Sequence, residues 1–276
     1  MRSALYVPGN RPELFDKAMA GPADVVLLDL EDSIPLRDKE SARALVAAWL
    51  RSLIDPPKPI WVRVNSGDLA AADIAAVAHP ALAALCLAKT ESAEQVRQAD
   101  ALLRGHEDRP GAIAVCALLE SARAILAAPA IAAVPRTARL QIGETDLRAE
   151  LGIVTSPGEP EMLALRTQVV LASAAAGIAA PLAPVRTDFR DLDALRVSTQ
   201  ALRRLGFRGR ACIHPAQLPV VNEVFTPGAA EVEQARALVR RFEAAAGGVV
   251  LDAQGRMVDL AVIRQARRVL AESPEG

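Results

Sequence analysis

Two carboxylates in this sequence follow predicted β-strands, a position from which side chains can do chemistry. The seven residues from Ile113 to Leu119 are all apolar, and Glu120 comes directly after them. Such a run is typical of a strand that is buried on both faces. Asp146 comes after the next predicted strand. Carboxylates on adjacent strands suit a hard cation such as Mg²⁺, which takes oxygen ligands; the alternative is that Glu120 caps or forms an ion pair with the next helix.

Arg63 ends another predicted strand and is a candidate for binding an oxyanion. Its guanidinium can hold a carboxylate or an enolate oxygen through two hydrogen bonds. The alternative is a structural ion pair with the acidic end of the preceding strand, at Asp29, Glu31 and Asp32. Because side chains alternate along a strand, we expect Glu31 to point away from its neighbours. We also expect at least one of the three acids to orient Arg63 or Lys89.

Other ionisable residues offer further chemistry. Lys89 could form a Schiff base, and His214 could act in catalysis or form a local hydrogen bond. His79 and His106 have helix-end or loop contexts and are predicted to lie on the surface. The sequence has no cluster of histidines and cysteines with the spacing of zinc ligands, so a zinc site is not expected.

The composition argues against several kinds of partner. The chain has 276 residues with 32 basic and 33 acidic side chains, so it lacks the basic surface that nucleic-acid binding needs. Cys86, Cys116 and Cys212 lie in apolar segments and form no CxxC pair, which is typical of buried, reduced thiols in a cytoplasmic protein. The N-terminal segment has no apolar run of signal-peptide length. Residues Thr167 to Val185 are uncharged and are predicted to form a core helix and a short strand rather than a membrane span.

Short apolar stretches alternate with longer helical segments along most of the chain. Strands are predicted over residues 4–9, 24–32, 59–66, 84–89, 113–120, 139–146, 180–188 and 209–215. Helices are predicted from residue 12 and over 38–53, 91–105, 159–176 and 192–206. This order implies a parallel sheet with right-handed crossovers, which closes most simply as a (β/α)8 TIM barrel; a doubly wound open sheet is the alternative. Barrel enzymes carry their active sites at the C-terminal ends of the strands, where the candidate residues stand.

The chain changes character after the eighth strand. An amphipathic helix is predicted over 229–246, a small hairpin over 247–260 with Gly247 and Gly248 as a hinge, and a last helix over 261–271. A closed barrel needs none of these elements. We therefore predict a catalytic barrel over residues 1–228 and a C-terminal extension over 229–276, which acts as a lid or as an arm on a neighbouring subunit.

Several longer motifs carry a resemblance to a known family. They are, in order, RSALYVPGNRPELFDKA, VVLLDLEDSIP with DKESAR, VRVNS, ALLESARAI, IGETDL, GFRGRACIHPAQLPVVNEVF and MVDLAVIRQARRVLA. From Arg2 to Leu270 the chain resembles the citrate lyase beta-subunit-like family of the HpcH/HpaI aldolase superfamily. This resemblance implies a TIM barrel that binds Mg²⁺ through Glu120 and Asp146 and contacts substrate through Arg63.

The resemblance also implies an activity. Members cleave or form a carbon–carbon bond in CoA thioesters such as citryl-, malyl- or citramalyl-CoA, and related members hydrolyse malyl-CoA. In members with an extended tail, an aspartate of a MID-x-P motif reaches the next subunit and transfers a proton. Asp259 in MVDLAV matches that aspartate, but Ala261 replaces the proline, which leaves the lid geometry open. A homotrimer or a dimer of trimers fits the family.

We therefore predict a cytoplasmic, Mg²⁺-dependent lyase that acts on a hydroxyacyl-CoA by retro-Claisen cleavage. The alternatives are a malyl-CoA-type thioesterase, a metal aldolase acting on a free hydroxy acid, and a non-catalytic scaffold barrel. The predicted site comprises catalytic Arg63, Asp259 and Asp32, the metal ligands Glu120 and Asp146, and Tyr6, Pro8 and Arg11 for the CoA nucleotide.

Overall fold

The protein consists of two compact units, Met1–Asn222 and Glu223–Gly276. A computed structural model describes residues 1–107, 109–244, 250–251, 255 and 257–273. The predicted boundary between barrel and extension at residue 228 stays a prediction.

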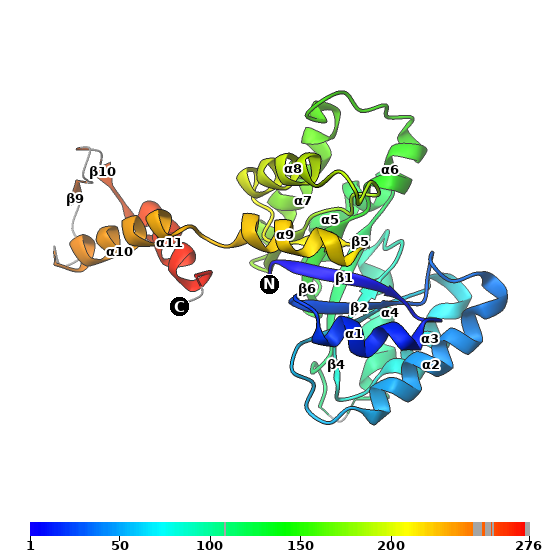
Figure 1. Ribbon diagram of the computed structural model, residues 1–276. Helices are drawn as coiled ribbons and strands as arrows, with labels where there is room; N and C mark the ends of the chain where they lie inside the picture. The colour runs from blue at the N-terminus through cyan, green and yellow to red at the C-terminus, as the bar shows by residue number, and fades with distance from the viewer. Residues whose placement is uncertain (108, 245–249, 252–254, 256, 274–276) are drawn as a thin grey trace. The chain divides into compact units, whose positions relative to one another are not determined.

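The first unit is a barrel of parallel strands (Figure 1). The strands are hydrogen-bonded in the order β7-β6-β5-β4-β3-β2-β1-β8. Ala183, just after β7, forms a parallel bridge with Arg210 of β8 and closes the ring. The structure therefore confirms the predicted TIM barrel over the open sheet. The strands are β1 (Ser3–Pro8), β2 (Val25–Asp29), β3 (Ile60–Val64), β4 (Leu82–Leu87), β5 (Ala114–Leu119), β6 (Thr137–Ile142), β7 (Ala179–Leu182) and β8 (Arg210–Cys212).

Helices surround the strands and connect them (Figure 1). Several begin at side-chain caps: Ser92 accepts from the Gln95 backbone at the start of α4, and Ser121 accepts from Ala124 at the start of α5. Such caps satisfy N–H groups that have no partner inside the helix. The α-helices of this part of the chain are α1 (Phe15–Ala20), α2 (Lys39–Ser52), α3 (Ala70–Val77), α4 (Ala93–Arg104), α5 (Ala122–Ala132), α6 (Glu144–Leu151), α7 (Leu163–Ala175), α8 (Leu192–Leu205) and α9 (Leu218–Phe225). The 3-10 helices are η1 (Pro12–Leu14), η2 (Leu36–Asp38), η3 (Gly67–Leu69), η4 (Pro160–Met162) and η5 (Pro215–Gln217).

The barrel interior is built mainly from small and aliphatic side chains. Strands β2 and β3 are buried at every position, which explains why the sequence shows near-continuous apolar runs instead of alternation. The three cysteines are buried and free, as predicted. The interior cluster comprises Ala4, Val25, Leu27, Trp61, Ala84, Cys86, Cys116, Leu118, Leu182 and Ala211.

Three short helices, α3, α6 and α9, were missing from the sequence prediction. The strand predicted over residues 139–146 ends at Ile142, and α6 begins at Glu144 after Gly143. Helix α3 lies between β3 and β4, where no helix was predicted. Each helix has only eight residues, too short for helical periodicity to separate it clearly from a loop or a strand.

The second unit contains a helical pair and a small hairpin. Helices α10 (Ala229–Ala244) and α11 (Leu260–Ala271) pack together. Strands β9 (Val250–Leu251) and β10 (Met257–Val258) pair antiparallel, as the predicted hairpin requires. Phe242, Val258 and Ile263 form the core of this unit. The predicted hinge at Gly247 and Gly248 lies outside the described residues.

The uncharged segment from Thr167 to Val185 folds as the end of α7 followed by β7, as predicted. Within the described part of the chain, none of the helices combines the length and the apolar character that a bilayer span requires.

Candidate active site

A pocket of about 380 Å³ opens at the C-terminal ends of the barrel strands. Six of the eight predicted site residues line it, on or just after β1, β2, β3, β5 and β6. They are Tyr6, Pro8, Asp32, Arg63, Glu120 and Asp146. The carboxyl ends of parallel strands meet at one rim of a barrel, so residues far apart in sequence converge here.

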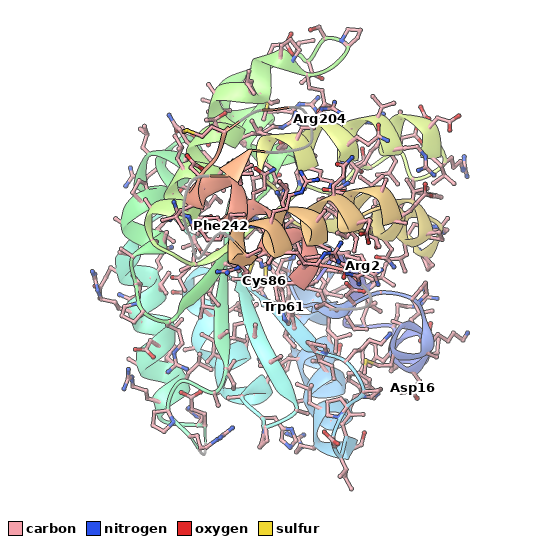
Figure 2. The ribbon with its side chains drawn as sticks, turned by 90° about the vertical axis from the view of Figure 1, so that its left-hand side faces the viewer. Arg2, Asp16, Trp61, Cys86, Arg204 and Phe242 are labelled. Carbon is pink, nitrogen blue, oxygen red and sulfur yellow. The ribbon has the colours of Figure 1, made fainter. Side chains whose placement is uncertain are left out.

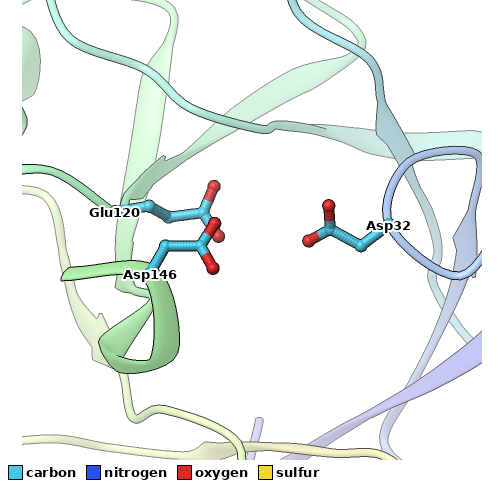
Figure 3. Close-up of side chains that lie close together, drawn as sticks. All are labelled: Asp32, Glu120 and Asp146. Atoms are coloured by element: carbon cyan, nitrogen blue, oxygen red, sulfur yellow. The ribbon is translucent and has the colours of Figure 1, made fainter. Parts of the chain in front are cut away.

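Three carboxylates gather in this pocket. One oxygen of each of Asp32, Glu120 and Asp146 lies within 4.8 Å of the others. Figure 3 shows Glu120 and Asp146 on one side and Asp32 facing them. Asp32 was predicted as a catalytic residue and not as a metal ligand, yet it belongs to the same cluster. The cluster offers only hard oxygen donors, the ligand set that suits Mg²⁺.

Glu120 is the buried member of the cluster, with 8% of its surface exposed. The backbone N–H of Lys89 donates to its Oε2 at 2.9 Å. Burial raises the pKa of the Glu120 carboxyl to about 7, and the nearby carboxylates of Glu31 and Asp146 contribute in the same direction. A cation bound beside Glu120 would therefore offset both the cost of burying its charge and the repulsion from Glu31 and Asp146.

Arg63 lies beside the cluster and is held by Asp29. Its Nε and Nη2 donate to the two oxygens of Asp29 at 2.6 and 2.7 Å. Burial raises the pKa of the Asp29 carboxyl, but the hydrogen bonds and charge of Arg63 outweigh this, so its pKa lies below the usual value. The ring of Tyr6 lies 4.9 Å from the guanidinium carbon, close enough for a cation–π contact. Arg63 is thus fixed from two sides.

The acidic segment after β2 also pairs with Lys89. Glu31 lies 3.0 Å from Nη1 of Arg63 and 2.5 Å from Nζ of Lys89, and Asp32 lies 3.3 Å from each nitrogen. The expectation that Glu31 points away from its neighbours is therefore wrong. Strand β2 ends at Asp29, so strand alternation does not extend to these positions. The expectation that an acid orients Arg63 or Lys89 is confirmed.

Lys89 is not placed for Schiff-base chemistry. Its hydrogen bond to Glu31 raises the pKa of the ammonium, and the charges of Glu31 and Asp32 add to this. A Schiff-base lysine must react as the neutral amine, so this arrangement disfavours that role.

Two other candidates of the first unit, Arg11 and His214, do not line this pocket. Arg11 is exposed and pairs with Glu13. His214 caps η5 by accepting from the Ala216 backbone and stacks on Phe189, 4.4 Å between ring centroids. Asp259 belongs to the second unit, where it caps α11.

Gly143 and Gln141 also line the pocket, although the sequence did not single them out as site residues. A Cβ atom at Gly143 would lie 2.5 Å from Cγ of Glu120, so only glycine leaves room for that side chain. Gln141 donates to the hydroxyl of Tyr6 at 3.1 Å. The sequence signal that could have identified Gly143 is its position between a predicted strand and the acidic sequence ETD.

Comparison with known proteins identifies the family. The family model described as HpcH/HpaI aldolase/citrate lyase matches residues 2–215. The chain belongs to this family. Its members are lyases and aldolases, so the barrel is that of a lyase family, in agreement with the resemblance of the motifs.

Relatives in this family match the chain over nearly its whole length. A citrate lyase subunit beta-like protein from Deinococcus radiodurans is 34% identical, over 98% of this chain and 96% of the relative. A (3S)-malyl-CoA thioesterase from Cereibacter sphaeroides is 35% identical, over 99% of this chain and 94% of the relative. The crystal structure of CitE from Mycobacterium tuberculosis with magnesium, acetoacetate and coenzyme A is 32% identical and covers 99% of this chain and 97% of its own, with a TM-score of 0.81.

Proposed function

We propose that this protein is a Mg²⁺-dependent lyase that cleaves or forms a carbon–carbon bond in a hydroxyacyl-CoA such as citryl-, malyl- or citramalyl-CoA. The products of cleavage are an acyl-CoA and a 2-oxo acid. The observation that carries the proposal is the cluster of Asp32, Glu120 and Asp146 beside Arg63. The similarity to a CitE structure that contains magnesium, acetoacetate and coenzyme A supports it.

The residues present fit a magnesium ion. Their donors are carboxylate oxygens at the mouth of a pocket that also leaves room for substrate and water, and Mg²⁺ commonly keeps such ligands beside one or two carboxylates. We propose Glu120 and Asp146 as the ligands. An ion bound there supplies Lewis acidity toward the hydroxyl and carboxylate oxygens of the substrate.

The protein's own residues account for the other steps. Asp32 accepts the proton of the substrate hydroxyl as the carbon–carbon bond breaks and that carbon becomes the oxo carbon of the 2-oxo acid. The bonding electrons remain on the thioester fragment as an enolate. Arg63 stabilises the enolate oxygen with a guanidinium already oriented by Asp29. Asp259 then donates a proton to the enolate carbon, which yields the acyl-CoA.

The position of Asp259 in the second unit leads to a proposal about assembly. We propose that the C-terminal extension, residues 229–276, is a lid that closes over the pocket of a neighbouring subunit in a homotrimer or a dimer of trimers. Lid closure would exclude water from the enolate. Tyr6, Pro8 and Arg11 stay predicted contacts of the CoA nucleotide.

A thioesterase is the second candidate, because the (3S)-malyl-CoA thioesterase relative is 35% identical. Product analysis separates the two. The protein is incubated with Mg²⁺ and malyl-, citramalyl- or citryl-CoA, and the products are separated by chromatography. A lyase yields acetyl-CoA with glyoxylate, pyruvate or oxaloacetate, whereas a thioesterase yields free CoA with the intact hydroxy acid.

Two controls connect the activity to the carboxylate cluster. A chelator and the Asp146→Ala variant should both abolish turnover, while Glu94→Ala, on the exposed surface of α4, should not change it. Turnover that survives both chelator and Asp146→Ala would contradict the metal-dependent mechanism.

A further inference from the structure

A second cavity of about 520 Å³ lies at the N-terminal ends of the barrel strands. Its lining includes Val25, Trp61, Ala84, Ala114 and Arg139. In barrels of this kind, layers of bulky branched side chains usually fill the interior. Here alanines from several strands stand at this level, and they leave space of the size that small-molecule pockets have.

The cavity is distinct from the active-site pocket. Side chains two residues apart on a strand point to the same face. On β3, Trp61 lines this cavity and Arg63 lines the active site; on β6, Arg139 lines this cavity and Gln141 lines the active site. The two spaces therefore occupy successive levels of the barrel interior.

Arg139 brings a positive charge into this cavity. Its Nη1 donates to the backbone oxygen of Arg208 at 3.4 Å, a long hydrogen bond. No carboxylate among the described residues forms an ion pair with it. Asp24 also lines the cavity, but it binds Arg2 through the backbone N–H, Nε and Nη2 at 2.6, 3.1 and 2.8 Å. A partly buried guanidinium without a counter-charge is costly, and an anion would lower that cost.

Trp61 supplies the apolar wall and one further donor. It is 8% exposed and belongs to the interior cluster, next to the strand that carries Cys86 (Figure 2). Its indole N–H donates no hydrogen bond to any described residue. The cavity thus presents an aromatic face, small apolar side chains, an indole N–H and the guanidinium of Arg139, and its carboxylate, Asp24, is already bound to Arg2.

We propose that this cavity binds a small amphipathic monocarboxylate at a second site, separate from the catalytic pocket. The carboxylate receives two hydrogen bonds from Arg139, as planar guanidinium groups favour. The hydrocarbon part of the ligand packs against Trp61 and the alanines. A monocarboxylate is favoured over a neutral apolar molecule because only an anion compensates Arg139.

The chain offers a direct reporter for this site. It has two tryptophans. Trp49 packs on Phe15 and donates to Asp16 at 3.0 Å, away from the cavity. In a Trp49→Phe background, Trp61 is the sole tryptophan, and its emission is titrated with octanoate. We expect a saturable change, with the same affinity when Asp146→Ala disables the active site.

Variants then separate charge recognition from apolar binding. Arg139→Gln should weaken octanoate binding about tenfold or more, the loss expected for a charge-assisted hydrogen bond, but should leave binding of 1-octanol unchanged. Arg97→Gln, on the exposed surface of α4, is the matched control and should bind octanoate like the parent. Ala114→Leu should fill the cavity and weaken both ligands, without touching the guanidinium.

Two results would overturn the proposal. One is the absence of any saturable octanoate response by fluorescence and by calorimetry in the parent protein. The other is equal octanoate affinity in the parent and in Arg139→Gln, or, where that variant does not fold, equal affinity in the parent and in Ala114→Leu. Loss of octanoate binding in Asp146→Ala would place the ligand in the active site instead and would also contradict the proposal.

Discussion

Gly143 lies directly against the side chain of Glu120. A Cβ atom at position 143 would be 2.5 Å from Cγ and 2.7 Å from Oε1 of Glu120. The Gly143 N–H donates to the Leu119 backbone at 2.8 Å, which holds this glycine in place beside the end of β5. The position of the buried carboxylate in the candidate metal site therefore depends on a neighbour without a side chain.

Replacement of Gly143 should move Glu120. In Gly143→Ala we expect Mg²⁺ affinity to fall about ten- to a hundredfold, the range observed when the support of a metal ligand is lost. The melting temperature should change little, because the displaced atoms belong to a side chain and not to the backbone. Calorimetric titration with Mg²⁺ measures the first effect. Gly105→Ala, where a Cβ would find ordinary contact at 3.5 Å, is the control; unchanged Mg²⁺ affinity in Gly143→Ala would contradict the assignment.

The pKa of Glu120 predicts how the stability of the metal-free protein depends on pH. Its pKa is raised from 4.5 to about 7 in the folded state. Between these values the folded state binds more protons than the unfolded state, so the free energy of unfolding falls as pH rises. We expect Glu120→Gln to be more stable than the parent by about 1–3 kcal/mol at pH 8 and similar to it at pH 4.

Thermal melts in the presence of a chelator measure this difference. Added Mg²⁺ should stabilise the parent at pH 8, because a carboxylate ligand binds the ion in its deprotonated form. It should have little effect on Glu120→Gln, because the neutral amide lacks that negative charge. If the difference in unfolding free energy between the parent and Glu120→Gln is the same at pH 4 and at pH 8, burial does not perturb the pKa of this carboxyl.

Arg63 should be irreplaceable by lysine. A lysine keeps the charge but loses the two parallel hydrogen bonds to Asp29 and the planar contact with Tyr6. In Arg63→Lys we expect kcat to fall about a hundredfold, the loss typical for removal of one oxyanion-stabilising donor, with Mg²⁺ affinity unchanged. Arg43→Lys is a matched control, since Arg43 also pairs with a buried aspartate, Asp73, but does not line the pocket. Equal losses in both variants would indicate a structural role only.

The two roles of Asp259 can be separated. Its Oδ1 accepts from the backbone of Ala261 and Val262 at 2.8 and 3.0 Å and caps α11. Asparagine caps helices about as well as aspartate but cannot transfer the proton. We therefore expect Asp259→Asn to keep the parental melting temperature and lose at least about tenfold in kcat, within the usual range for a general acid. Full turnover in Asp259→Asn would exclude this residue as the proton donor.

The alternation of strands and helices and the starts of the barrel strands could be predicted from the sequence, whereas the predicted ends of β2, β6, β7 and β8 lie beyond the observed ones. Apolar runs such as Ile113–Leu119 have a clear physical cause, because strands buried on both faces are mostly apolar and a polar side chain buried there without a partner costs free energy. The placement of Glu120, Asp146 and Arg63 at one rim followed from the barrel, since parallel strands direct their C-terminal ends to the same side.

The contacts between residues distant in sequence were decided only by the tertiary structure. Asp32 joins the carboxylate cluster because the chain turns after β2, and strand periodicity gives no direction beyond that turn. The fit of Gly143 to Glu120 and the cavity around Arg139 depend on how neighbouring strands are staggered. A sequence specifies which side chains each strand carries, but packing around the closed barrel determines which of them share one space and which charges remain uncompensated there.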